Sequence, residues 1–316
     1  MRRLPIFPAL GPAPATIRVQ AGREVGGRAQ VTSFLPTSVA ARPGDTLRFV
    51  NPTLDTPHTV TSGLADDKAT WPVALLADAR PNPAWLQPCV AAGRPGPAAD
   101  DCPTPAPSTG AGGAIEEPFA GQGFYNTGLL DPGAALDVHL GPTLAPGAYV
   151  FRCLIHRGMD LSVRVEEPGA AIPGQAAVDA LADEQATTDV RTARPPVPPD
   201  GTAGAFAVGG WGRGVTVDRV TPAVVSVRAG EVVSWRNFGV GPHSVAFGSD
   251  GRADRVLAAG PASLGEEAGY GGGFAYSGWI SAAVGRATFS LRFMERGRYP
   301  FRCVFHPGMT GLVIVG

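Results

Sequence analysis

Two short stretches of the chain each carry one Cys, one His and one Met at the same spacing. Residues 151–159 read FRCLIHRGM and residues 301–309 read FRCVFHPGM. In both stretches the His follows the Cys by three positions, and the Met follows the His by three. The chain holds only 4 Cys, 5 His and 4 Met in 316 residues. A repeated group of sulfur and nitrogen donors therefore predicts binding of a soft metal ion.

A second His, preceded by Pro, lies upstream of each stretch. A thiolate, two imidazoles and a weak axial thioether form the ligand set of a blue-copper electron-transfer site. Zinc also binds such His and Cys donors, but the thioether favours copper. Any one of these residues alone would more often be a packing residue, so the prediction depends on the complete set occurring twice. The expected ligands of two copper ions are His58, Cys153, His156 and Met159, and His243, Cys303, His306 and Met309.

The repeat extends well beyond the donor residues. Residues 34–63 and 220–248 share a Pro, an alternating segment, a Gly with an acidic residue, a second alternating segment, an Asn and a Pro-His pair. Residues 147–165 match residues 297–315 in the same way. Alternation with a period of two between Gly and Pro turns is typical of antiparallel strands, and the 43 Gly and 32 Pro fit many turns. The sequence predicts an all-β chain with a duplicated domain.

The two copies differ in length, which sets the expected domain limits. The first copy contains a Pro-rich and Gly-rich insertion, and RPPVPPDGTAG between the copies predicts a stiff connector followed by flexible glycine. We expect an N-terminal extension (1–14), a first domain (15–168) with an insertion at about 66–118, a linker with a possible short helix (169–202), and a second domain (203–316).

With these motifs the chain resembles a tandem cupredoxin, from the blue type 1 copper protein family that includes plastocyanin and amicyanin. The Cys-x-x-His-x-x-Met spacing is closest to amicyanin, and CVFHPGMTGLVIV matches its ligand loop and final strand. The resemblance covers both copies and implies two Greek-key β-sandwiches, each with copper beneath loops at one end. It also implies that His156 and His306 present an imidazole edge to a partner. Thr59 and Ser244 stand where many members have Asn.

The expected function is electron transfer between redox partner proteins by cycling Cu(II) and Cu(I). Two alternatives are copper storage or delivery, and one redox domain beside a structural or partner-binding domain. An enzyme is not expected, because four of the 5 His belong to the two sites. His139, the remaining one, is expected on a strand, so a trinuclear or three-histidine copper site lacks ligands.

Charge and the remaining cysteines bear on partners and compartment. The formal net charge of -1 gives no basic footprint for nucleic acid, and no apolar run reaches the roughly 20 residues of a transmembrane helix. Cys89 and Cys102 lie in the insertion and predict a disulfide. A disulfide needs an oxidising compartment, so a periplasmic or extracellular location is expected, although MRRLPIFPALGPAPA is a poor secretory signal. The sequence does not indicate an oligomeric state.

Overall fold

Strands dominate the computed structural model of the chain. One helix, α2 (Gln175–Thr192), lies among the described residues, and no described helix is long and apolar enough to cross a bilayer. The expected all-β fold is confirmed. The structure describes residues 13–26, 29–54, 56–63, 88–91, 117–156, 158–194, 204–212, 214–239, 242–248, 262–265, 267–281, 285–304, 306 and 308–316.

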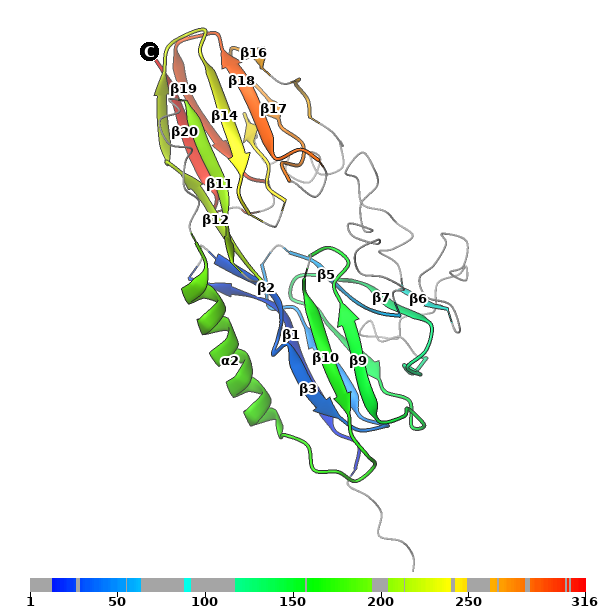
Figure 1. The fold of residues 1–316 in the computed structure, drawn as a ribbon. Helices are drawn as coiled ribbons and strands as arrows, with labels where there is room; N and C mark the ends of the chain where they lie inside the picture. The colour runs from blue at the N-terminus through cyan, green and yellow to red at the C-terminus, as the bar shows by residue number, and fades with distance from the viewer. Residues whose placement is uncertain are drawn as a thin grey trace, which may run out of the picture.

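The N-terminal half forms a sandwich of two sheets, called the first sandwich here (Figure 1). One layer has the strand order β2-β1-β4-β8 and the other β3-β10-β9-β5-β7-β6. Alternate side chains of both layers face inward, as in Val19, Phe49 and Phe151, and form one apolar core. The strands are β1 (Thr16–Val25), β2 (Ala29–Leu35), β3 (Ser38–Ala41), β4 (Thr46–Val50), β5 (His58–Ser62), β6 (Pro88–Ala91), β7 (Phe124–Leu130), β8 (Ala135–His139), β9 (Gly147–Arg152) and β10 (Asp160–Val165).

The C-terminal half repeats this arrangement as the second sandwich. Its layers have the orders β16-β18-β14-β11-β12 and β13-β20-β19-β15-β17. The core contains the fully buried Trp235, whose ring stacks on Phe206 at 5.5 Å between centroids. The strands are β11 (Ala205–Gly212), β12 (Val215–Thr221), β13 (Val224–Val227), β14 (Val232–Asn237), β15 (Ala246–Phe247), β16 (Ala268–Tyr270), β17 (Ala275–Tyr276), β18 (Thr288–Phe293), β19 (Gly297–Arg302) and β20 (Thr310–Val315).

The two sandwiches share a sheet. Strand β2 pairs antiparallel with β12, so that one layer of each sandwich becomes part of a single nine-stranded sheet. We call this junction the seam and define it by its paired residues. These are Val31 with Val215, Gln30 with Thr216, and Ala29 with Val217.

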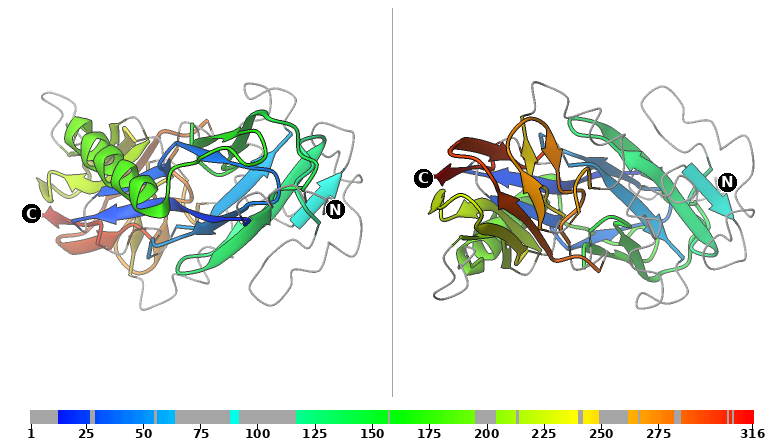
Figure 2. Two further views of the ribbon diagram at one scale, coloured as in Figure 1. Left: turned by 90° about the horizontal axis from the view of Figure 1, so that it is seen from below. Right: turned by 90° about the horizontal axis from the view of Figure 1, so that it is seen from above.

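Helix α2 packs against the seam. Ala182 and Ala186 on the helix form a buried apolar cluster with Val31, Leu35 and Val215. The helix lies beside β1 and β2 in Figure 1, and Figure 2 shows it from two further directions. A short helix was expected only as part of a linker; it also covers the strands that join the two halves. The domain limits given above stay predictions.

Several expectations concern the insertion, most of which lies outside the described residues. The described residues 88–91 form β6, which pairs with β7 at the edge of the first sandwich. Cys89 is buried on this strand. Because Cys102 lies outside the described residues, its disulfide with Cys89 stays a prediction.

Candidate metal centres

In each sandwich, an asparagine side chain positions the segment that carries the upstream histidine. In the first sandwich, the buried Asn51 side chain donates hydrogen bonds to the carbonyls of Thr56 (2.9 Å) and Leu130 (3.0 Å). This fixes the segment that leads to His58, the first residue of β5. In the second sandwich, Asn237 donates to the carbonyl of Ile280 at 2.6 Å. The Asn of the repeat, noted in the sequence only as part of the pattern, therefore positions the histidine segment.

The other three predicted ligands of each centre lie on the loop between the last two strands of a sandwich. Cys153 directly follows β9, and its backbone N–H donates to the carbonyl of Met159 (3.0 Å). The N–H of Met159 in turn donates to the carbonyl of His156 (3.2 Å). The second loop repeats both bonds, from Cys303 to Met309 (2.9 Å) and from Met309 to His306 (2.8 Å).

The structure brings the three nitrogen and sulfur donors of the first centre together in the interior. The Sγ atom of Cys153 lies 3.4 Å from Nδ1 of His156 and 3.9 Å from Nδ1 of His58. The donor atoms of the three residues all lie within 4.8 Å of one another. Met159 is fully buried in the same apolar cluster as Cys153. One ion could therefore contact both imidazoles and the sulfur at once.

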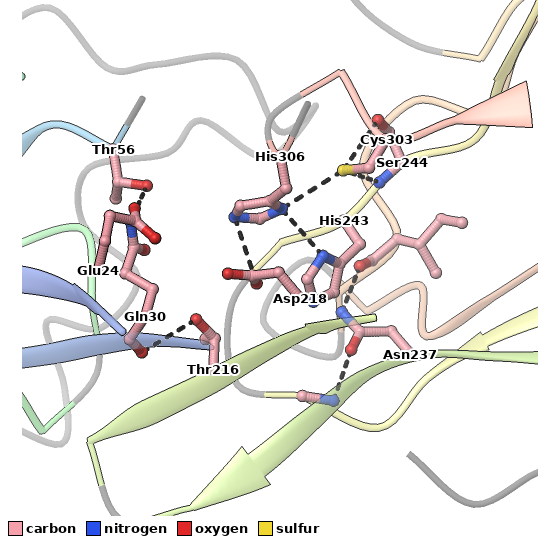
Figure 3. Close-up of polar contacts among 12 residues, drawn as sticks. Glu24, Gln30, Thr56, Thr216, Asp218, Asn237, His243, Ser244, Cys303 and His306 are labelled. Atoms are coloured by element: carbon pink, nitrogen blue, oxygen red, sulfur yellow. Dashed lines mark hydrogen bonds and ion pairs between the residues drawn. The ribbon is translucent and has the colours of Figure 1, made fainter. Parts of the chain in front are cut away.

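The second centre has the same construction. Nδ1 of His243 lies 3.2 Å from Nδ1 of His306, which lies 3.5 Å from Sγ of Cys303 (Figure 3). Met309 is buried in the same cluster as Cys303. Each centre thus turns the same ring nitrogen of both histidines toward the cysteine sulfur. The residues Arg157 and Pro307 beside the loop histidines lie outside the described residues.

Hydroxyl groups tie the two segments of each centre together. The N–H of Leu154 donates to Oγ1 of Thr59 (2.7 Å), and the N–H of Val304 donates to Oγ of Ser244 (3.0 Å). The backbone N–H groups of Thr59 and Ser244 also donate to the sulfurs of Cys153 and Cys303, both at 3.4 Å. Thr59 and Ser244, which depart from the expected Asn, therefore link the histidine segment to the cysteine loop. Such second contacts orient metal ligands and tune them.

A glycine lies against the outer face of each upstream histidine. Gly22 on β1 and Gly209 on β11 sit at breaks in strand register, with φ of 79° and 67°. A Cβ atom on Gly22 would lie 2.6 Å from Nε2 of His58, and one on Gly209 would collide with Nε2 of His243. We did not predict these positions, although an isolated Gly inside a strand can indicate a bulge or a close approach.

Burial favours the neutral form of both histidines in the first centre. It lowers the pKa of His58 well below its usual value, with the neighbouring His156 adding to the effect. Burial, and then the proximity of His306, lower the pKa of His156 to about 4. A neutral imidazole offers a lone pair to a metal near pH 7. Burial also raises the pKa of the Cys153 thiol, so in the first centre the thiolate that a soft metal prefers would form together with metal binding. In the second centre burial likewise acts to raise the pKa of the Cys303 thiol, but the interactions with His306 and His243 outweigh it and hold that pKa well below its usual value.

The donor chemistry fits copper. In each centre two buried imidazoles and one buried sulfur lie within 4.8 Å of one another, and a buried thioether belongs to the same loop as the sulfur. Nε2 of His58 and of His243 is buried and has no hydrogen-bond partner among the described residues. The inward-facing Nδ1 atoms are therefore the ring nitrogens placed to serve as ligands. This set of ligand types is the one used by blue-copper centres.

The comparison with known proteins finds a copper-binding family over the part of the chain that contains the second centre. Residues 219–316 match the family model of copper binding proteins, plastocyanin/azurin family. Among similar solved structures, amicyanin from Paracoccus versutus (Thiobacillus versutus) is 22% identical, with 40% of this chain and 96% of that chain covered and a TM-score of 0.25. A purple cupredoxin from Nitrosopumilus maritimus is 23% identical, with 32% and 84% covered and a TM-score of 0.22. Over residues 219–316 the chain is therefore similar to the copper-binding proteins of the plastocyanin/azurin family.

Proposed function

We propose that the chain is an electron carrier that holds two copper ions, one in each sandwich. The observation that supports this most strongly is the convergence of one buried Cys sulfur and two buried His Nδ1 atoms at each of two equivalent places. The proposed ligands are His58, Cys153, His156 and Met159 in the first centre, and His243, Cys303, His306 and Met309 in the second. Copper would supply a one-electron couple at each centre.

The protein would hold its ligands in the same place whichever oxidation state is present. The loop from Cys153 to Met159 is closed by its own backbone hydrogen bonds and joined to the histidine segment through Thr59. The loop from Cys303 to Met309 is joined in the same way through Ser244. Because the donors are already in place, little needs to move when charge arrives or leaves. Such a site suits a carrier better than it suits an enzyme that must admit a substrate.

The burial of the donors also bears on the alternative of copper delivery. His58 and His243 are fully enclosed, and both cysteines are buried. A protein that hands its metal to another chain needs ligands that the recipient can reach. Closed centres therefore favour electron transfer. The redox partners and the periplasmic or extracellular location are parts of the same proposal.

Titration of the copper-free protein with Cu(II) tests this function. We expect two ions per chain and an intense blue absorption that reductant bleaches and oxidant restores. Cys153→Ser and Cys303→Ser should each remove one ion and one of the two blue signals while the other remains. A colourless complex, or copper that a mild chelator removes rapidly, would contradict an electron carrier and would favour delivery.

A further inference from the structure

The loop histidine of each centre is buried although it lies near the end of its sandwich. His156 is 8% exposed and His306 is 9% exposed. The family resemblance led us to expect that both present an edge to a partner protein. Nε2 of His306 instead lies 3.6 Å from Oδ1 of Asp218 on β12, a strand of the seam (Figure 3). The outer side of His306 is thus turned toward the junction of the sandwiches, and His156 is the equivalent residue of the first sandwich.

The seam explains this orientation because it is close to symmetric. Aligning Gly44 with Gly230 and Asn51 with Asn237 makes Gln30 and Thr216 equivalent positions, and these two residues pair directly. The same alignment makes Val31 equivalent to Val217 and Ala29 equivalent to Val215. The pair Val31–Val215 therefore corresponds to the pair Val217–Ala29. The sandwiches therefore meet through the same strand of each, as in a two-fold symmetric dimer. Each sandwich therefore presents the same face to the seam.

Hydrogen bonds across the seam join the histidine segment of the first sandwich to β12 of the second. The Gln30 side chain donates to Oγ1 of Thr56 (2.8 Å), two residues before His58. Oγ1 of Thr216 donates to the carbonyl of Gln30 (3.4 Å). Asp218 lies two residues beyond Thr216 on the same strand. Figure 3 shows Gln30 and Thr216 on the two paired strands, with Thr56 on one side and His306 on the other.

The seam is held from outside by α2, so its geometry does not depend on three residue pairs alone. Ala182 and Ala186 pack onto the apolar side chains of both paired strands. Gln185 accepts a hydrogen bond from the backbone N–H of Thr37 (2.8 Å). A backbone hydrogen bond from Thr32 to Gly214 (2.8 Å) extends the ladder. The two sandwiches are therefore packed together as well as linked by the chain.

We propose that His156 and His306 form an internal route for electrons between the two centres, so that the chain works as a two-centre relay. This inference rests on the proposed function. One electron leaves one centre, which is oxidised, and enters the other, which is reduced. No bond forms or breaks, no proton moves and no outside oxidant is needed. An electron delivered to either centre could then reach the other without leaving the protein.

A labelling experiment on the copper-free protein tests the geometry. Diethyl pyrocarbonate modifies accessible imidazoles, and His139, exposed at the end of β8, serves as an internal reference. We expect rapid modification of His139, protection of His156 and His306, and loss of that protection on unfolding. Modification of His156 or His306 as fast as His139 would show that the loop histidines open to solvent, which would overturn the proposal.

Partial reduction of the copper-loaded protein tests the route. A Met309→Gln variant shifts the potential of the second centre and so gives the electron a preferred destination. After a photochemical pulse that delivers less than one electron per chain, we expect redistribution between the centres at a rate independent of protein concentration. The matched control is a mixture of a Cys153→Ser, Met309→Gln protein and a Cys303→Ser protein, which carry the same two centres on separate chains and should exchange electrons only in proportion to concentration.

The outcomes separate the two proposals. If wild-type protein binds two coppers and turns blue but redistribution is absent or rises with concentration, the relay is wrong and the carrier function stands. Pulsed dipolar spectroscopy on the fully oxidised protein gives a second measure, for which a single narrow copper-to-copper distance is expected. A broad distribution would show that the sandwiches move apart, and would overturn the relay as well.

Discussion

At the scale of single residues, the first centre depends on two histidines whose burial favours the uncharged form. A buried charged imidazole loses the hydration that it has in water, so burial favours the neutral form. His58 and His156 are buried, and burial is the main cause of their lowered pKa values. The same burial that prepares them for a metal makes the copper-free protein sensitive to acid.

We predict that the copper-free protein loses stability as the pH falls from about 6.5 toward 4. The unfolded chain binds a proton on His156 below its ordinary pKa of 6.5, whereas the folded chain does so only near 4. In this interval the unfolded state binds more protons than the folded state. The free energy of unfolding therefore decreases as the pH is lowered, by at most about 1.4 kcal/mol per pH unit for each such histidine. Denaturant unfolding at several pH values measures it.

A His156→Gln variant provides the control for this prediction. It removes one titrating group but keeps a polar side chain of similar reach, so its stability should depend less steeply on pH between 6.5 and 4. Equal slopes for the variant and the wild-type protein would mean that His156 does not carry the shifted pKa.

The proposed ligand residues were inferred from the sequence, but the residues that surround them were not. Cys153, His156 and Met159 lie on one loop, so their spacing alone indicates a common function. Asp218 and Gly22 are separated from the residues that they approach by long stretches of chain, and neither type is rare. Their positions depend on how the strands pack, which the spacing of residues does not reveal.

At the scale of elements, β1 and β11 shape the space behind the upstream histidines. A break in the register of each strand places a glycine with positive φ against an imidazole. The positive φ disfavours a side chain at these positions, and the close approach leaves no room for one. The backbones of these two strands therefore lie directly against the imidazoles of His58 and His243.

We predict that Gly22→Ala weakens copper binding at the first centre. A Cβ atom there would lie 2.6 Å from Nε2 of His58 and must displace the ring. The matched control is Gly44→Ala, because Gly44 also has positive φ (85°) but a Cβ atom there would have no neighbour within 4 Å. Both variants should lose about 1–2 kcal/mol of stability through the disfavoured φ.

Copper affinity then separates the two effects. Only Gly22→Ala should lower it, as measured by competition with a chelator, and the second centre should keep its affinity. If both variants lowered the affinity of the first centre equally, backbone strain rather than contact with His58 would be the cause.

The alternation of apolar and polar residues predicted strands within the repeated segments, because a half-buried sheet imposes that pattern. Residues 175–194 show the limit of such reasoning. A short helix was expected there, but nothing in its sequence indicated that Ala182 and Ala186 would pack onto paired strands from both halves. Alanine is common in helices whatever they contact, so the partner of this helix became evident only from the fold.

At the scale of the whole molecule, pairing of β2 with β12 turns two similar sandwiches into one continuous sheet. The duplication was evident in the sequence, whereas this contact was not. The paired residues Ala29, Gln30 and Val31 carry no motif, and edge strands of many sandwiches have similar composition. The junction bears on the proposed relay because one of its strands, β12, carries Asp218, which faces the loop histidine His306.

Anomalous diffraction at the copper edge, on crystals of the copper-loaded protein, tests the central claim most directly. We predict two anomalous peaks per chain, one among His58, Cys153 and His156 and the other among His243, Cys303 and His306. A single peak, or peaks at surface residues with both clusters empty, would contradict the account.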